Sequence, residues 1–333
     1  MTSGEAQPIR IGTRASRLAL WQAHYVKDLL HGVSSRPVEI VHITTTGDQQ
    51  QLQPLHQLGN VGVFTREVQL ALLDGRADIA VHSLKDLPTI PTPGLVLAGV
   101  PIRGPMFDVL VFPANRVREK QNEDANSSPL ESLAPHARIG TGSLRRQAQI
   151  LFHRPDLDVL PIRGNVDTRL KKLDAGEFDA LVLAAAGLHR LGFDQWPRVE
   201  LAPPAMYPAV GQGAVGIECR DDDRELKNLL QKFTDRATFD AVTAERTLLN
   251  ELQAGCHAPV GIWSRFENDV QHLDAVVLSL DGRQRISASA SMDGDSIRTA
   301  SELGRRVAGI LRDAGADPLL ESTRIPPNAA EQS

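Results

Sequence analysis

The chain has 333 residues, of which 41 % are hydrophobic and 23 % are charged, and its formal net charge is −5. This length allows two or three domains, and the composition is typical of a globular protein. The small net charge gives no indication of nucleic-acid or membrane-surface binding. The apolar runs are too short to span a bilayer, and the N-terminus lacks a signal-peptide pattern, so we expect a cytoplasmic protein.

Short β-branched runs alternate with helical patterns along the first two thirds of the chain, which predicts an α/β fold. The expected strands cover residues 8–13, 37–46, 77–83, 95–100, 107–112, 137–141, 157–164 and 178–187. The expected helices of this region cover residues 16–30, 65–75, 143–154 and 165–176. A polar segment over 114–135 interrupts the series and indicates a linker or a surface insertion.

The pattern then restarts, which is an internal repeat. The tetrapeptide RIGT occurs at 10–13 and at 138–141, and the spacing G-x-x-D-x-x-V occurs at 75–81 and at 176–182. Two matches in the same order predict two similar lobes. Paired α/β lobes commonly bind a ligand in the cleft that separates them.

The last hundred residues differ from the two lobes. A glycine-rich stretch at 208–220 suits a crossing between lobes, and a helix pattern at 236–253 follows it. Three strand patterns lie at 258–266, 273–282 and 283–292, with Asp-Gly at a hairpin turn, and a helix pattern covers 296–315. We expect a smaller C-terminal α/β domain with a three-stranded antiparallel sheet.

Arginines gather after the predicted strands. Arg145 and Arg146 fall in a first helical turn, where the helix dipole disfavours cations unless an anion is bound. Thr141 and Ser143 precede them and offer hydroxyl groups, so the segment suits a carboxylate or a phosphate. Solvated surface arginines are the alternative. The other arginines of this set are Arg14, Arg17, Arg163, Arg169 and Arg190.

Titratable residues follow a strand in only one of the two repeats. The segment HSLKDLP places Lys85 and Asp86 at the carboxyl end of a strand, where α/β proteins bind ligands. The matching segment of the second lobe, LAAAGL, has no ionisable group. Asp86 is a candidate acid, base or stabiliser of a cation, and a surface Lys-Asp pair is the alternative.

Two cysteines give neither a disulfide framework nor a four-ligand zinc site, so we expect reduced thiols and no metal. Cys219 lies in an apolar strand-like run and is a core candidate. Cys256 stands between Gly255 and His257, a context that suits a reactive thiol, although a buried inert thiol is the usual state of a free cysteine.

Six segments together resemble the porphobilinogen deaminase family, whose members are also called hydroxymethylbilane synthases. They are GTRASRLALWQA, HSLKDLP, GTGSLRRQ, IRGNVDTRL, PAVGQGAVGIECR and AERTLLNELQAGCHAPVG. The resemblance runs from about Ile9 to about Leu320. It implies three α/β domains, the first two like type II periplasmic binding proteins. These are expected at 1–113 with 212–232, at 114–211, and at 233–333.

The resemblance also implies an activity. Family members join four porphobilinogen molecules head to tail into linear hydroxymethylbilane, in tetrapyrrole and heme biosynthesis, and release ammonia. A dipyrromethane cofactor bound to a cysteine by a thioether primes the chain, and Cys256 falls on that cysteine. Asp86 falls on the catalytic aspartate. The implied binding residues are Arg14, Ser16, Ser83, Lys85, Thr141, Ser143, Arg145, Arg146, Arg163, Arg169 and Arg190.

Some positions depart from the bacterial family pattern. Gln57 and Val61 replace lysines over the expected cleft, Phe107 replaces a basic residue, and Ala254 replaces a glycine. The segment 116–129 is an insertion. The expected protein is a monomer, in possible transient contact with the next pathway enzyme. A non-catalytic two-lobed protein that binds a polycarboxylate is the alternative.

Overall fold

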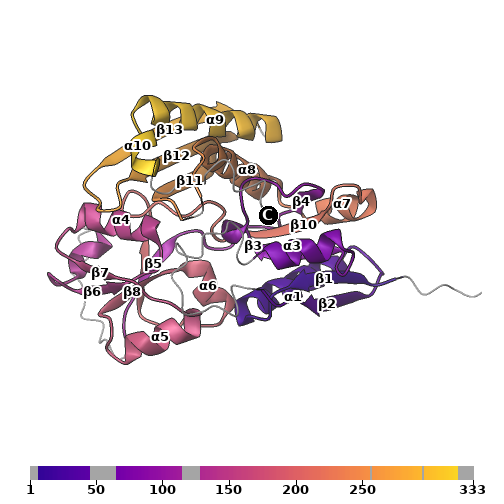
Figure 1. Cartoon of the computed structure of the whole chain (residues 1–333), viewed down its shortest axis with the longest axis horizontal. Coiled ribbons are helices and arrows are strands. Elements are labelled where there is room, and N and C mark those ends of the chain that lie inside the picture. The colour runs from indigo at the N-terminus through magenta and orange to yellow at the C-terminus, as the bar shows by residue number, and fades with distance from the viewer. Residues whose placement is uncertain (1–6, 46–64, 115–127, 256, 295, 322–333) are drawn as a thin grey trace, which may run out of the picture. The chain divides into compact units, whose positions relative to one another are not determined.

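The computed structural model describes residues 7–45, 65–114, 128–255, 257–294 and 296–321 (Figure 1). The chain divides into two compact units, Met1–Gly104 with Ala214–Phe239 and Pro105–Gly213 with Asp240–Ser333. The division into three domains at the boundaries expected from the sequence stays a prediction. Among the described residues, no helix has the length and apolar character needed to cross a lipid bilayer.

The first unit contains one sheet of five strands. They are β1 (Ile9–Thr13), β2 (Val38–His42), β3 (Ile79–Ser83), β4 (Leu95–Gly99) and β10 (Val215–Arg220), in the order β2-β1-β3-β10-β4. β1 is parallel to β2 and β3, whereas β10 is antiparallel to both of its neighbours. Helices α1 (Arg17–His31) and α7 (Arg224–Gln231) bury apolar side chains on one face, and α3 (Arg66–Leu73) does so on the other.

The second unit contains a sheet of the same design. Its strands are β5 (Asp108–Val111), β6 (Arg138–Gly140), β7 (Asp158–Leu160), β8 (Ala180–Ala184) and β9 (Arg198–Leu201), in the order β7-β6-β8-β5-β9. β5 is antiparallel to β8 and β9, as β10 is in the first sheet. Its helices are α4 (Leu144–His153), α5 (Val166–Asp174) and α6 (Ala185–Arg190). The expected pair of similar α/β lobes is confirmed.

The internal repeat has a structural cause. Arg10 donates its backbone N–H to Asp78 Oδ2 at 2.9 Å and its Nη2 to Oδ1 at 2.8 Å. Arg138 donates in the same way to Asp179, at 2.7 Å to Oδ2 and 2.9 Å to Oδ1. The arginine of RIGT therefore pairs with the aspartate of G-x-x-D-x-x-V in each lobe. The two motifs join adjacent strands at the amino ends of the sheets.

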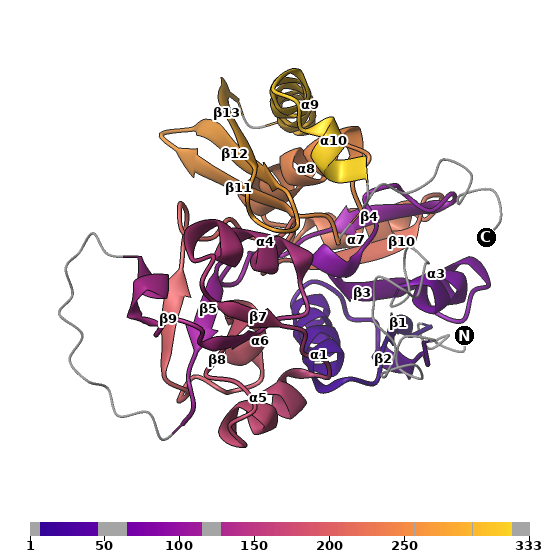
Figure 2. The ribbon, with the colours of Figure 1, turned by 60° about the vertical axis from the view of Figure 1, so that its left-hand side comes forward.

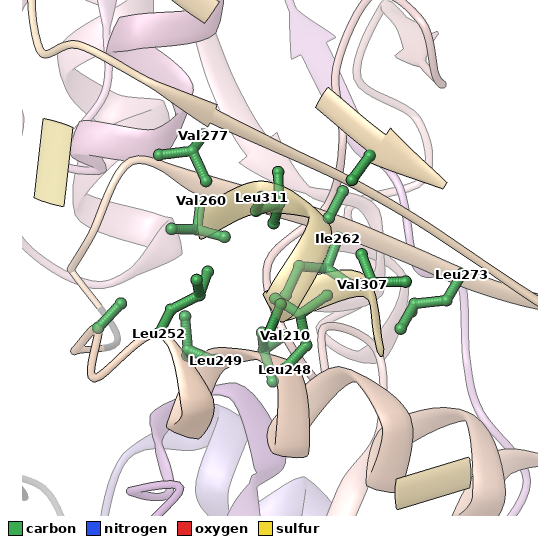
Figure 3. Close-up of a cluster of buried hydrophobic side chains, with 14 of the residues drawn as sticks. Val210, Leu248, Leu249, Leu252, Val260, Ile262, Leu273, Val277, Val307 and Leu311 are labelled. Atoms are coloured by element: carbon green, nitrogen blue, oxygen red, sulfur yellow. The ribbon is translucent and has the colours of Figure 1, made fainter. Parts of the chain in front are cut away.

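The C-terminal part of the second unit has a third sheet, as expected. β11 (Val260–Glu267), β12 (Val270–Leu278) and β13 (Arg285–Asp293) form an antiparallel sheet in chain order (Figure 2). Helices α8 (Arg236–Glu251), α9 (Ile297–Asp313) and α10 (Asp317–Leu320) accompany it. Figure 3 shows the shared core, in which Leu248 of α8 and Leu252, directly after that helix, lie near Val260 and Ile262 of β11 and Val307 and Leu311 of α9.

The prediction from the sequence was wrong about the extent of one strand, and it omitted several strands, helices and turns. The expected strand at 178–187 ends at Ala184, and helix α6 begins at Ala185. Alanine has a high helix propensity, so the apolar run LAAAG continues as a helix after the last paired residue of the strand. The elements without a sequence prediction are β9, α7, α10 and the 3₁₀ turns η2 (Leu84–Asp86) and η3 (Pro129–Ser132).

Candidate active site

Asp108 and two arginines form a buried charge cluster in the second unit. Asp108 is the first residue of β5 and is fully buried. Its Oδ2 accepts from Arg145 Nη2 at 2.8 Å, and its Oδ1 accepts from Arg146 Nη2 at 2.8 Å. Both arginines, in the first turn of α4, are also buried. One carboxylate thus faces two guanidiniums, which leaves a surplus of positive charge.

The electrostatics of Asp108 follow from this pairing. Burial alone would raise the pKa of Asp108, but the charges of Arg145 and Arg146 lower it to about 2. Gln212 Nε2 donates to Asp108 Oδ1 at 2.9 Å and to the Met106 carbonyl at 2.8 Å. The carboxylate is therefore ionised at neutral pH and held in one orientation by three side chains.

Two further arginines extend the positive cluster. Burial and the nearby charges of Arg146 and Arg163 lower the pKa of Arg169 to about 10. Burial also lowers the pKa of Arg163. Arg169 is fixed by a hydrogen bond of 2.8 Å from its Nε to the Gly164 carbonyl. Burial and both neighbouring charges disfavour the charged form of Arg169, so an anion bound beside it would offset this electrostatic cost.

The predicted hydroxyl ligands lie at helix starts. Ser143 Oγ accepts from the Arg146 N–H at 3.5 Å at the start of α4, and Ser16 Oγ accepts from the Ala19 N–H at 3.3 Å at the start of α1. Thr141 is buried, and its Oγ1 accepts from the Ser143 N–H at 3.3 Å. Accepting at a cap leaves each hydroxyl hydrogen as a donor, which suits an anion near the helix start.

Arg145 and Arg190 also bind the protein backbone. Arg145 Nη1 donates to the Tyr207 carbonyl at 2.5 Å, which adds a second fixed contact to its bond with Asp108. Arg190, at the end of α6, donates its Nη2 to the Gly213 carbonyl at 2.6 Å. The sequence predicted both as carboxylate ligands, and that role stays a prediction. Arg14 follows β1 and is half-buried.

The predicted acidic group lies in the first unit. Lys85 and Asp86 belong to the 3₁₀ turn η2, directly after β3, and both are half-buried. Ser83, the last residue of β3, accepts from Gln22 Nε2 of α1 at 2.8 Å. The corresponding place in the second lobe, after β8, is the start of α6, where Ala185, Ala186 and Gly187 stand. The asymmetry expected from the two repeats is therefore present.

Several predicted features lie outside the described residues. They are Cys256, Gln57, Val61 and most of the 116–129 insertion. Cys219, by contrast, is buried in β10, and burial raises the pKa of its thiol to about 11, which makes it an unreactive core residue.

Two of the atypical positions have packing roles. Phe107 lies edge-on to Trp263, with the ring centroids 6.0 Å apart. Ala254 is 2 % exposed and belongs to the core of the C-terminal sheet. Their side chains are thus accounted for by apolar contacts.

Sequence reasoning missed Asp108 and Gln212. Asp108 opens the otherwise apolar strand DVLVF, and a charged residue in a strand buried on both faces signals a buried partner. Gln212 stands between two glycines with positive φ, Gly211 at 65° and Gly213 at 85°. The glycines shape the crossing segment so that the Gln212 amide reaches β5. Within the described ranges, no cluster of three or more His, Cys, Asp or Glu could hold a metal ion.

Comparison with known families decides the affiliation. Residues 9–228 match the family model described as porphobilinogen deaminase, dipyromethane cofactor binding domain, and residues 239–313 match the one described as porphobilinogen deaminase, C-terminal domain. The chain belongs to the porphobilinogen deaminase family. The resemblance predicted from the six sequence segments is confirmed.

Relatives named porphobilinogen deaminase match almost the whole chain. The one from Desulforudis audaxviator is 45 % identical over 316 residues, which cover 94 % of this chain and 97 % of that one. The one from Chromobacterium violaceum is 43 % identical over 320 residues, which cover 96 % and 99 %. The solved structure of an ancestral cationic amino acid solute binding protein gives a TM-score of only 0.40, at 17 % identity, over 68 % of this chain and 87 % of that one.

The arginine cluster fits the cofactor named for this domain. Dipyrromethane has two pyrrole rings that each bear an acetate and a propionate, so it is a polycarboxylate. The surplus charge around Asp108 and the lowered pKa of Arg169 call for such a counter-ion. Arginine is suited to the task because it stays charged and binds a carboxylate through two parallel hydrogen bonds. Arg146, Arg163 and Arg169 are the residues that would hold the cofactor carboxylates.

Proposed function

We propose that the protein joins four porphobilinogen molecules head to tail into hydroxymethylbilane, with dipyrromethane bound to Cys256 as primer. Four porphobilinogen molecules and one water give one hydroxymethylbilane and four ammonia molecules. The cluster in which Arg146, bonded to Asp108, lies near Arg163 and Arg169 carries the proposal, because its surplus of positive charge suits a substrate with two carboxylates. When bound, dipyrromethane supplies the pyrrole carbon to which the first substrate ring is joined.

The arginines bind and orient. Arg146 donates its Nη1 to the Val182 carbonyl at 2.9 Å in addition to its bonds with Asp108, so its guanidinium plane is fixed before any ligand arrives. A preorganised cation binds an anion with a smaller loss of conformational entropy than a flexible one does. Arg163 and Arg169 add the charge for further carboxylates, since each substrate ring brings two.

Asp86 handles the proton and the positive charge. The carboxylate at this position binds the substrate's aminomethyl group, which is an ammonium before it leaves as ammonia. The same carboxylate stabilises positive charge on a pyrrole nitrogen. Lys85 directly precedes it, Ser83 stands three residues before it, and both are expected to hold the substrate by hydrogen bonds.

Intact-protein mass spectrometry tests the proposal. The parent protein should carry an added mass equal to one dipyrromethane, and Cys256→Ser should lack it. Cys219→Ser is the matched control, because that thiol is buried, and it should keep the added mass. A parent that forms hydroxymethylbilane without the added mass would refute the cofactor site.

Turnover separates an enzyme from a binding protein. Asp86→Asn should keep the added mass and lose nearly all hydroxymethylbilane formation. A parent protein that binds polycarboxylates but forms no product would instead support the non-catalytic alternative.

A further inference from the structure

A buried carboxylate of the first unit has no role in the chemistry described so far. Glu218 lies on β10 and is 4 % exposed. Gln69 of α3 donates its Nε2 to Glu218 Oε1 at 3.1 Å and to Oε2 at 3.0 Å. His82 of β3 places its Nε2 3.0 Å from Oε2. Three elements thus converge on one buried anion.

The contact with His82 comes from an adjacent strand of the same sheet. The two side chains are diagonal neighbours on one face of the sheet, because Glu218 lies opposite Ala80 and His82 lies opposite Gly216. The imidazole Nε2 is close to Oε2 but has no aligned hydrogen-bond acceptor among the described residues. A buried carboxylate without a compensating charge or donors is strongly destabilising, so Glu218 depends on His82 and Gln69.

The cluster holds the end of the strand that leads to Asp86. His82 contacts Glu218 of β10 on the face of the sheet that α3 covers. Ser83, the next residue, is hydrogen-bonded to Gln22 of α1 on the opposite face. Leu84 then donates its N–H to the Ala214 carbonyl at 3.1 Å and is 1 % exposed. Three successive residues are therefore fixed from three directions directly before the turn that bears Asp86.

Gly216 allows the residue after Ser83 to pack closely on β10. A Cβ atom at residue 216 would lie 2.7 Å from Leu84 Cδ1, so the absence of a side chain at Gly216 lets Leu84 pack closely onto β10. A shift of the strand end away from β10 would lengthen the contact between His82 and Glu218.

We propose that Glu218, through His82, is a positioning residue that fixes the direction in which Asp86 meets the substrate. The inference rests on the proposed function, because it assigns Glu218 a part in that reaction. Displacing a catalytic group by about 1 Å lowers a rate by up to about 100-fold. A positioning role therefore predicts a loss in kcat, whereas a role only in folding predicts a loss of folded protein with normal kcat.

The variant Glu218→Gln tests this at constant shape. We expect kcat per folded, cofactor-bearing molecule to fall by about 10- to 100-fold, with KM for porphobilinogen changed by less than about threefold. Gln69→Met removes both donors to Glu218 from α3 and should change kcat in the same direction. It decides the matter if Glu218→Gln does not fold.

Asp78→Asn is the matched control, because Asp78 directly precedes the amino end of the same strand and pairs with Arg10. It should lower thermal stability and leave kcat within about twofold of the parent. Normal kcat in whichever of Glu218→Gln and Gln69→Met folds would overturn the inference. Absence of product from the parent protein would instead overturn the proposed function.

Discussion

Asp108 binds Arg146 at two points, accepting from Nε at 3.1 Å and from Nη2 at 2.8 Å on the same oxygen. Its other oxygen is taken by Arg145. The first turn of α4 is thereby fixed to β5, although a helix dipole disfavours cations there. The carboxylate offsets only one of the two charges, so the site is stable enough to fold and still positive enough to attract an anion.

Removing the Asp108 charge should be severely destabilising. Asp108→Asn leaves two buried guanidiniums without a counter-ion, and breaking a buried ion pair costs about 3–5 kcal/mol. The free energy of unfolding, measured with denaturant, checks this. Asp179→Asn is the control, because its pair with Arg138 is about half-exposed and should contribute less than about 1 kcal/mol. Equal losses in the two variants would contradict the proposed importance of the buried cluster.

Acid should weaken the protein through the same residue. The pKa of Asp108 is about 2 in the folded protein and near 3.8 when it is unpaired, so the folded state binds fewer protons over this interval. The stabilisation, on the order of 2 kcal/mol, is present above pH 4 and is lost as the pH falls toward 2. Unfolding measured at several pH values should show a steeper loss in the parent than in Asp108→Asn, since other carboxylates titrate in both.

Arg169 should be unfavourable for stability and necessary for function. Its pKa of about 10 shows that its charge is disfavoured in the folded protein, a penalty that disappears only as the pH rises above that value. We expect cofactor-free Arg169→Met to be at least as stable as the cofactor-free parent, and to retain less dipyrromethane when the cofactor is supplied.

Thermal unfolding and intact mass measure the two effects of Arg169→Met. Lys171→Met, an exposed change on the same helix, should alter neither. A melting temperature of cofactor-free Arg169→Met well below that of its parent would show that the guanidinium serves packing and not anion binding.

Two glycines of α9 should respond oppositely to alanine. A Cβ atom at Gly309 meets nothing within 4 Å, so Gly309→Ala should stabilise the helix by about 0.5–1 kcal/mol. A Cβ atom at Gly304 would lie 2.6 Å from the Ala244 carbonyl oxygen, so Gly304→Ala should destabilise the contact between α9 and α8. Denaturant unfolding of both variants checks the signs. A gain in both would mean that the helices separate easily.

The frame of the fold was predictable because it is periodic. Strand and helix patterns, together with the repeated RIGT motif, predicted both lobes and the C-terminal sheet. The end of β8 was mistaken because an apolar run does not reveal whether it is strand or helix, and Ala185 begins a helix.

The candidate site was only partly predictable. The arginines were visible as a set, but a sequence does not show which acids lie beside them in space. Asp108 lies 37 residues from Arg145, and Glu218 lies 149 residues from Gln69. Such partners are brought together by the packing of helices on the sheets, so only a charged residue inside an apolar strand gave a hint of them.

The two lobes share the ion pairs of Arg10 and Arg138 at one end of their sheets, and they differ in the residues at the other end. Both pairs close the amino ends of their sheets, whereas the acidic turn and the arginine cluster lie at or beyond carboxyl ends. Loops at the carboxyl ends are therefore open to exchange or redesign without loss of the ion pairs at the amino ends. The two lobes are copies of one scaffold, and they differ in the residues that follow the carboxyl ends of their strands.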